Sequence, residues 1–407
     1  MSRLPLLALF SANAISLTGN VLTLIAVPWF VLQTTGSAVK TGLTAFFAAL
    51  AVVVAAFLGG VVVDRLGYKR ASIVADLASG TAVALIPLLY ATVGLAFWQL
   101  LALVFLGNLC DAPGTTARTA LVPDVARAAT MPLEQATASA QAIQRGARLL
   151  GAPLAGVLIA ALGVSRVLWV DAATFGVSAL LVGVAMPAIP TMRLAASIEE
   201  ERHGQGYLAE LLEGFRVIGR DRLIRAIVLT VLVTNFLDAP LFSVIMPVYA
   251  KRTFGSALAL GLMAAADGGG ALVGAVLFSV VGYRLPRRAT FIGAFVLVGL
   301  PFWALAALPS LPVALLALFV TGLAAGPINP IIYTVAYERI PEAARGCVLG
   351  TLTAGAFVAI PLGVLLAGYA LQGLGIRVTV AGVAACYLVV TLSLLVNPAI
   401  REMRPPV

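Results

Sequence analysis

The feature that most constrains this chain is a succession of apolar runs, each about twenty residues long or longer, separated by polar or charged turns. A run of that length matches a helix of about 30 Å, the thickness of a bilayer's hydrocarbon core. The runs show no sustained alternation of apolar and polar residues, so strands are not the spanning element. We count twelve runs, with approximate limits 7–32, 40–63, 72–94, 97–118, 136–162, 166–187, 222–248, 256–281, 289–308, 311–334, 346–370 and 376–397.

The balance of apolar and charged residues supports a lipid environment. The chain is 61% hydrophobic and 11% charged, whereas a soluble domain carries about 25% charged residues. A water-soluble core cannot absorb this much apolar surface, so the predicted fold class is an all-α integral membrane protein. The net charge of +9 does not indicate nucleic-acid binding, because the basic residues lie in turns between apolar runs.

The placement of lysine and arginine predicts the orientation, because cytoplasmic loops of membrane proteins carry an excess of both. With the N-terminus inside, only five of the 26 basic residues fall outside. These five are Lys40, Arg166, Lys251, Arg252 and Arg377. We therefore expect a multi-pass protein of the cell (inner) membrane with both termini in the cytoplasm.

The chain repeats itself across its longest polar stretch. GSAVKTGL from Gly36 returns as GSALALGL from Gly255, and Pro28 and Pro247 stand at the same offset before the two copies. Between the halves, apolar residues from Leu208 recur at helical spacing, which predicts an amphipathic helix at the membrane surface. The predicted domains are a six-helix bundle over 1–190, a cytoplasmic linker over 191–220 and a second six-helix bundle over 221–407.

The turn after the second apolar run concentrates charge in the stretch GGVVVDRLGYKR. Its spacing resembles the G-x-x-x-D-R-x-G-R-[KR] loop of the major facilitator superfamily, which joins helices 2 and 3 on the cytoplasmic side; an ordinary positive-inside loop is the alternative. The resemblance implies two six-helix bundles around a central cavity, and a gate in which Asp64 contacts the end of the fourth span and the start of the eleventh. The implied gate residues are Gly60, Asp64, Arg65, Gly67, Lys69, Arg70, Arg118 and Gly346.

Ionisable groups inside lipid are costly, so those within apolar runs are functional candidates. Three aspartates qualify, in the order Asp238, Asp267 and Asp111, against the alternative that each only pairs or caps. Pro240 predicts that the helix is bent or broken beside Asp238. In the family the spans with Asn20, Asn108, Asn235 and Asn329 line the central path, so the resemblance implies that these side chains reach one cavity.

The fifth run carries further candidates. Arg145 and Arg148 share a helical face, and counting residues places both deep enough for an ion pair with Asp111. Farther along the same run, Gly146, Gly151, Pro153 and Gly156 partly resemble the G-P-x-x-G-G pattern of antiporters in the family. Packing glycines without a transport role are the alternative.

Three longer segments resemble the Tap-type and macrolide- or siderophore-exporting members of the superfamily. They are ALVPD, LLEGFRVIGRDRLIRAIVL and GPINPIIYTVAYERIPEAARGCVLG. The resemblance implies proton-driven export of drugs or siderophores. The family's R-x-x-x-G-x-G motif has no clean match here, since NLCDAPGTTAR carries Asp111 instead.

The function we predict is secondary export of lipophilic or cationic small molecules, coupled to inward proton flow by a protonatable aspartate. The alternatives are a siderophore or metabolite exporter, an uptake carrier, and a non-transporting membrane receptor or enzyme. No nucleophile–base constellation, metal cluster or nucleotide loop is present in the sequence. We therefore expect no enzyme activity, no metal and no cofactor, a proton gradient as energy source, and a functional monomer.

Overall fold

The structure is a computed structural model that describes residues 4–186, 216, 218–340, 355 and 357–403, with the side chains of 57–62, 64 and 283 also outside the description. All regular elements of these residues are helices. Eleven of them are long and apolar enough to cross a bilayer. A further apolar helix, α16 (Ile360–Gly373), continues the predicted span 346–370, whose first part lies outside the described residues. The predicted all-helical membrane fold is confirmed.

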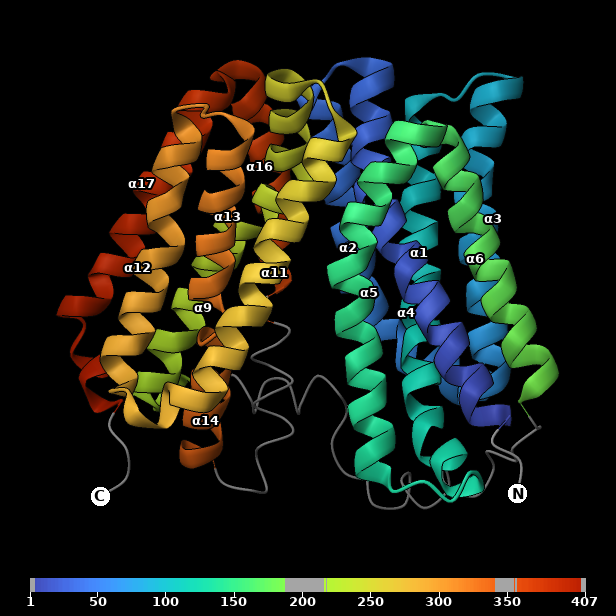
Figure 1. Cartoon of the computed structure of the whole chain (residues 1–407), viewed down its shortest axis with the longest axis horizontal. Coiled ribbons are helices and arrows are strands. Elements are labelled where there is room, and N and C mark those ends of the chain that lie inside the picture. Colours follow the sequence, from blue (N-terminus) through green and yellow to red (C-terminus); the bar gives the residue numbers. More distant parts are fainter. Residues whose placement is uncertain (1–3, 187–215, 217, 341–354, 356, 404–407) are drawn as a thin grey trace. The chain divides into compact units, whose positions relative to one another are not determined.

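The described residues form two compact units, and in each the helices run side by side (Figure 1). The first unit holds α1 and α3 to α6, α2 from Leu43 onward and the segment Ser256–Gly261; the second holds Ser37–Gly42 and the remaining helices. The predicted linker 191–220, with its amphipathic helix, lies almost wholly outside the described residues.

Six long helices make up most of the first unit. Their bounds are α1 (Leu4–Thr35), α2 (Ala38–Leu66), α3 (Tyr68–Thr92), α4 (Phe97–Ala128), α5 (Leu133–Leu162) and α6 (Val164–Ala185). α3 packs against α4 and α6, and α1 packs against α5 and α6. Small residues permit this: a Cβ at Gly80 of α3 would lie 2.9 Å from the Phe175 Cβ of α6. Close approach through glycine is how helices associate when lipid supplies no hydrophobic drive.

The second unit contains more broken helices. Its elements are α9 (Arg222–Pro240), the π-helix η1 (Leu241–Ile245), α10 (Met246–Tyr249), the π-helix η2 (Ala250–Phe254), α11 (Ala257–Val281) from Leu262 onward, the 3₁₀ turn η3 (Gly282–Arg284), α12 (Arg287–Ala306), α13 (Leu311–Ala325), α14 (Ile328–Arg339), α16, α17 (Gly375–Val396) and the 3₁₀ turn η5 (Pro398–Glu402). α12 packs against α13 and α17, and α9 packs against α16.

Large apolar side chains cover the outer faces of both units. Val184 in the first unit is 79% exposed and Val396 in the second is 75% exposed. In water such faces would be an aggregation hazard. Across membrane-spanning helices they are the surface that lipid tails cover.

Candidate functional site

Asp238 lies where the regular part of its helix ends. α9 stops at Pro240, two residues later, and the chain continues as the π-helix η1. Proline removes a backbone donor and crowds the preceding turn, which accounts for the change of hydrogen-bond pattern. The helical hydrogen-bond pattern therefore changes two residues after Asp238, within a helical segment that continues to Phe254, and short π segments inside helices occur often at functional sites.

The Asp238 carboxylate has one hydrogen-bond donor and one like-charged neighbour. The hydroxyl of Tyr387 in α17 donates to Asp238 Oδ2 across a long 3.4 Å. Asp267 of α11 lies close enough for the two carboxylates to repel each other. Among the described residues, neither aspartate forms a salt bridge with lysine or arginine. The arrangement suits groups that carry a proton or attract a cation.

Tyr387 is fixed in place by α12. Its side chain is buried, and its ring meets Phe302 edge-on with centroids 5.6 Å apart. A Cβ at Gly299 would lie 2.7 Å from Tyr387 Cδ1, so glycine there leaves room for the ring. We did not predict Tyr387, because a tyrosine in an apolar run carries no signal of the carboxylate it contacts.

Asp267 is held by direct contact between helix backbones. A Cβ at Gly322 of α13 would collide with the carbonyl oxygen of Asp267, and Gly270 lies against the backbone of Phe319 in the same way. The glycines that follow Asp267 therefore do permit the close approach that their sequence indicates. Asn235 is half-buried one turn before Asp238, whereas Asn329 is exposed at the start of α14.

Asp111 of α4 forms the corresponding polar site in the first unit. Asn20 of α1 donates from Nδ2 to Asp111 Oδ2 at 3.0 Å, which brings together two of the predicted residues. Asp111 Oδ1 is buried and has no hydrogen-bond partner in the described structure. Asn108 donates instead to the carbonyl oxygen of Val104 in its own helix, at 2.8 Å.

The predicted ion pair between Asp111 and an arginine of α5 is wrong. Arg145 and Arg148 are both exposed, and neither belongs to a salt bridge in the described part of the chain. Counting residues located their depth along the helix. It did not give the direction in which the side chains project.

Arg118 has several buried partners among the described residues, and its predicted contact with Asp64 stays a prediction, since that side chain lies outside them. It is 1% exposed, and its Nη1 donates to Asp76 Oδ1 at 2.6 Å. Its Nη2 donates to the hydroxyl oxygens of Ser16 at 3.2 Å and Thr115 at 3.4 Å. The Ser178 hydroxyl completes the network by donating to Asp76 Oδ2 at 2.7 Å. In this structure Arg118 ties α4 to α1 and α3, and Ser178 adds α6.

Neither Asp76 nor Asp171 was among the predicted residues. Asp171, in α6, is fully buried. The hydroxyl groups of Thr23 and Thr174 donate to it, and Gly19 packs against the same group so closely that a Cβ there would collide. Asp76 and Asp171 lie inside apolar runs just as Asp111 does. Applying the cost of buried charge to every embedded aspartate would have identified both.

The charged turn between α2 and α3 is a tight connection, as predicted. Gly67 separates the two helices with φ 75° and ψ 149°, a conformation that favours glycine. Lys69 Nζ donates to the carbonyl oxygen of Met186, while Arg65 and Arg70 are exposed. Three of the predicted gate positions are not described here. They are the side chain of Asp64, the surroundings of Gly60, and Gly346.

α5 runs unbroken through its glycine–proline segment. A Cβ at Gly151 would lie 2.9 Å from Val21 of α1, so this glycine sits at a helix crossing. Gly156 lies against Gly261, in the segment Ser256–Gly261 of the same unit, and Gly146 has open space around it. Pro153 remains inside the helix. Two of the three predicted glycines are thus packing positions.

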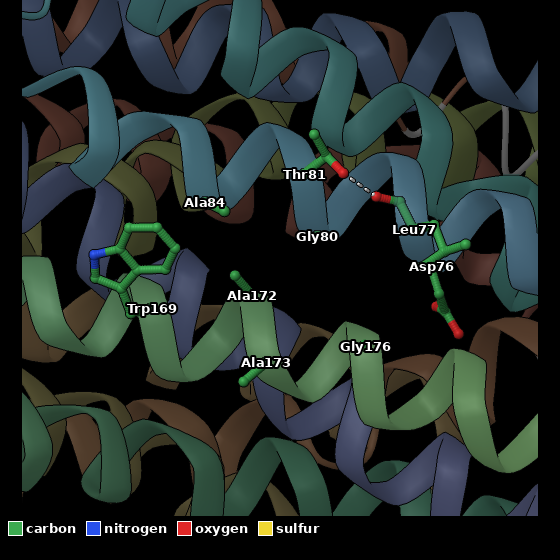
Figure 2. Close-up of a pocket in the computed structure, with 9 residues that line it drawn as sticks. All are labelled: Asp76, Leu77, Gly80, Thr81, Ala84, Trp169, Ala172, Ala173 and Gly176. Atoms are coloured by element: carbon green, nitrogen blue, oxygen red, sulfur yellow. Dashed lines mark hydrogen bonds between the residues drawn. The ribbon is translucent and has the colours of Figure 1, made fainter.

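A pocket of about 330 Å³ lies between α3 and α6 (Figure 2). Small residues of the two helices form its floor, Trp169 lies at one end and Asp76 at the other. Asp76 is already bound by Arg118. None of the residues that we predicted to bind substrate lines this pocket. Across the described residues, no three His, Cys, Asp or Glu side chains come together as metal ligands.

The family model described as Major Facilitator Superfamily matches residues 9–249 and 228–406. The chain belongs to the major facilitator superfamily. Within it, the chain is 33% identical to the multidrug efflux pump Tap of Mycobacterium tuberculosis over 99% of its own length and 95% of the relative's. It is 29% identical to the enterobactin exporter EntS of Citrobacter koseri, over 98% and 93% of the two lengths.

Solved structures of superfamily transporters have the same fold. The nucleoside transporter NupG superposes with a TM-score of 0.76 at 13% identity, over 97% of this chain and 98% of NupG. An inward-facing bacterial homologue of the lysosomal transporter Spinster superposes with a TM-score of 0.72 at 16% identity, over 99% and 98%. The chain is thus a multi-pass membrane transporter that acts on a small molecule, not an enzyme.

Proposed function

We propose that the protein exports lipophilic or cationic small molecules across the cell membrane in exchange for protons that move inward. Similarity to Tap efflux pumps over nearly the whole chain supports drug export. The observation that carries the coupling is Asp238, a carboxylate at an interrupted helix with no cationic partner among the described residues. Both termini lie in the cytoplasm in this proposal, one chain suffices, and the proton gradient drives transport without a cofactor.

The chemistry of exchange follows from one carboxylate serving two ligands. A proton that binds Asp238 from outside neutralises the carboxylate and releases a bound cation. A cation that binds from inside favours the ionised form and sends the proton to the cytoplasm. Asp267 is our second choice for the coupling residue and Asp111 the third.

The experiment is dye efflux by Asp238→Asn in proteoliposomes with an imposed pH gradient. Asparagine keeps the shape of the side chain and cannot exchange a proton. We expect gradient-driven efflux of a lipophilic cationic dye to fall to its level without a gradient, while downhill counterflow survives. Asp124→Asn is the matched control, because Asp124 lies near the end of α4 beside the exposed Arg127. Efflux by Asp238→Asn that still follows the pH gradient would show that Asp238 is structural.

A siderophore or other metabolite is the second candidate substrate, because the chain is also similar to an enterobactin exporter. A panel of lipophilic cations and anionic metal chelators in the same proteoliposomes separates the two classes. Transport of cations alone supports drug export. Transport of chelators alone supports export of a siderophore or other metabolite. Substrate movement opposite to the proposed export would show that the protein is an uptake carrier.

A further inference from the structure

A second pocket, of about 430 Å³, lies in the second unit where α9 begins and η5 follows α17. Arg222 and Arg225 line it from α9, and Asn397 and Glu402 line it from the other side. Leu229, one turn beyond Arg225, completes the α9 side. The pocket contains none of the residues assigned above to transport.

Arg222 and Arg225 bring positive charge to one side of the pocket. Both are exposed, and their spacing of three residues puts them on one face of α9. Arg225 Nη1 donates to the carbonyl oxygen of Gly219 at 3.0 Å. In the described part of the chain neither Arg222 nor Arg225 has a carboxylate within salt-bridge distance. Both guanidinium groups have further N–H donors that can hydrogen-bond to an anion at this face.

The acidic groups nearby are already engaged. Arg339 donates from Nη1 to Asp221 Oδ2 and from Nη2 to Glu402 Oε2, both at 3.0 Å. Asp221 also accepts from the backbone N–H groups of Leu223 and Ile224 as the N-cap of α9. Three arginines (Arg222, Arg225 and Arg339) stand against these two carboxylates. Among the residues that line the pocket, two arginines stand against Glu402, so the lining favours an anionic group.

The pocket also joins a polar end to an apolar face. α9 is the start of a membrane-spanning segment that runs from Arg222 to Phe254. Leu229 is 56% exposed, and its Cα lies about 6 Å along the helix from that of Arg225. On the α17 side Asn397 directly follows Val396, which is 75% exposed. A ligand with a charged head and an apolar tail matches this layout, whereas a free phosphate ion uses only half of it.

We propose that this pocket binds the phosphodiester headgroup of an anionic phospholipid. Arg222 and Arg225 hold the phosphate oxygens, and the Asn397 amide adds a donor, since its Oδ1 is occupied by the N–H of Ala399 at 3.0 Å. The acyl chains run along the exposed face that begins at Leu229. Basic pockets beside membrane helices on the cytoplasmic side are a recognised mode of headgroup binding, and the distribution of lysine and arginine assigns this end to the cytoplasm.

The test is lipid binding to the purified full chain in detergent, measured by native mass spectrometry during titration with phosphatidylglycerol. The double variant Arg222→Gln/Arg225→Gln should bind phosphatidylglycerol at least about 10-fold more weakly, because the phosphate loses charge-assisted hydrogen bonds to both guanidinium groups. The control Arg216→Gln/Arg220→Gln also removes two exposed arginines from the approach to α9 and leaves the pocket intact. It should bind within about twofold of the parent.

Three outcomes would overturn the proposal. Equal losses in the two double variants would mean general attraction to a basic surface instead of a pocket. Equal affinity for phosphatidylcholine would remove the role of net charge, and displacement by inorganic phosphate at equal concentration would assign the site to a free anion.

If the glutamine variant fails to fold, Arg222→Lys/Arg225→Lys keeps the charge without the planar fork. It should show intermediate affinity, and unchanged affinity in that variant also counts against specific arginine contacts.

Discussion

Removing the carboxylate of Asp76 should destabilise the first unit severely. Asp76→Ala deletes the acceptor for Arg118 Nη1 at 2.6 Å and for the Ser178 hydroxyl at 2.7 Å. Both charged partners are 1% exposed, so water cannot replace the lost contact. Among the described residues, the Arg118 guanidinium then keeps two neutral hydroxyl partners.

The expected loss of unfolding free energy is about 3–5 kcal/mol, the cost of leaving one partner of a buried pair uncompensated. The chain offers a matched comparison in Asp124→Ala, since Arg127 is 81% exposed in its pair with Asp124 at 3.5 Å. That variant should lose less than about 1 kcal/mol, because solvent screens exposed pairs. Replacing both buried partners, as Asp76→Leu/Arg118→Met, should restore most of the lost stability.

The measurement is reversible unfolding in mixed micelles of increasing SDS content, with the free energy of unfolding compared among the four proteins. A loss in Asp76→Ala no larger than that in Asp124→Ala would refute the reasoning. So would a double variant as unstable as the single one, because the cost would then come from packing and not from an unpaired charge.

Two glycine substitutions test how backbone space shapes this fold. Gly299→Ala places a Cβ 2.7 Å from the Tyr387 ring. The variant should lose about 1–3 kcal/mol of unfolding free energy and show lower proton-driven dye efflux. The double variant Gly299→Ala/Tyr387→Leu should regain stability but not efflux. Gly67→Ala forces a Cβ into a backbone with φ 75° and ψ 149°; it should cost about 1–3 kcal/mol, measured by the same unfolding titration. Gly146→Ala is the control, since nothing lies within 4 Å of its Cβ position, and a cost there equal to that at Gly67 would contradict the argument from backbone conformation.

Features that depend on local chemistry were predictable from the sequence. The apolar runs specify helices because lipid leaves the backbone no other partner. Gly67 and Pro240 act on their own backbones, so the turn and the helix interruption appear at the expected residues.

Contacts that depend on helix rotation were not predictable in the same way. Arg118 and Asp76 are 42 positions apart, and nothing local in either segment shows that the two side chains meet. Arg145 and Arg148 show the converse, since their predicted depth suited an ion pair but both residues are exposed. A sequence pattern predicts how far along its helix a residue lies. Which side chain that residue contacts depends on how the helix is rotated against its neighbours.

The π-helix after Pro240 has a consequence for how this segment tolerates length changes. An i→i+5 turn accommodates one residue more than the α-helical turn it replaces, and each residue rotates an α-helix by about 100°. Deleting a single residue within Leu241–Ile245 would let α9 continue as a regular helix into Met246. Because the π turn already absorbs the extra residue, the deletion would leave Asn235 and Asp238 in place and change the facing of the residues beyond it little, whereas deleting one residue from the regular part of α9 would turn everything beyond by about 100°. In an alignment of relatives, a one-residue gap at Leu241–Ile245 therefore preserves the direction of the side chains beyond it, and the same gap in the regular part of α9 redirects them.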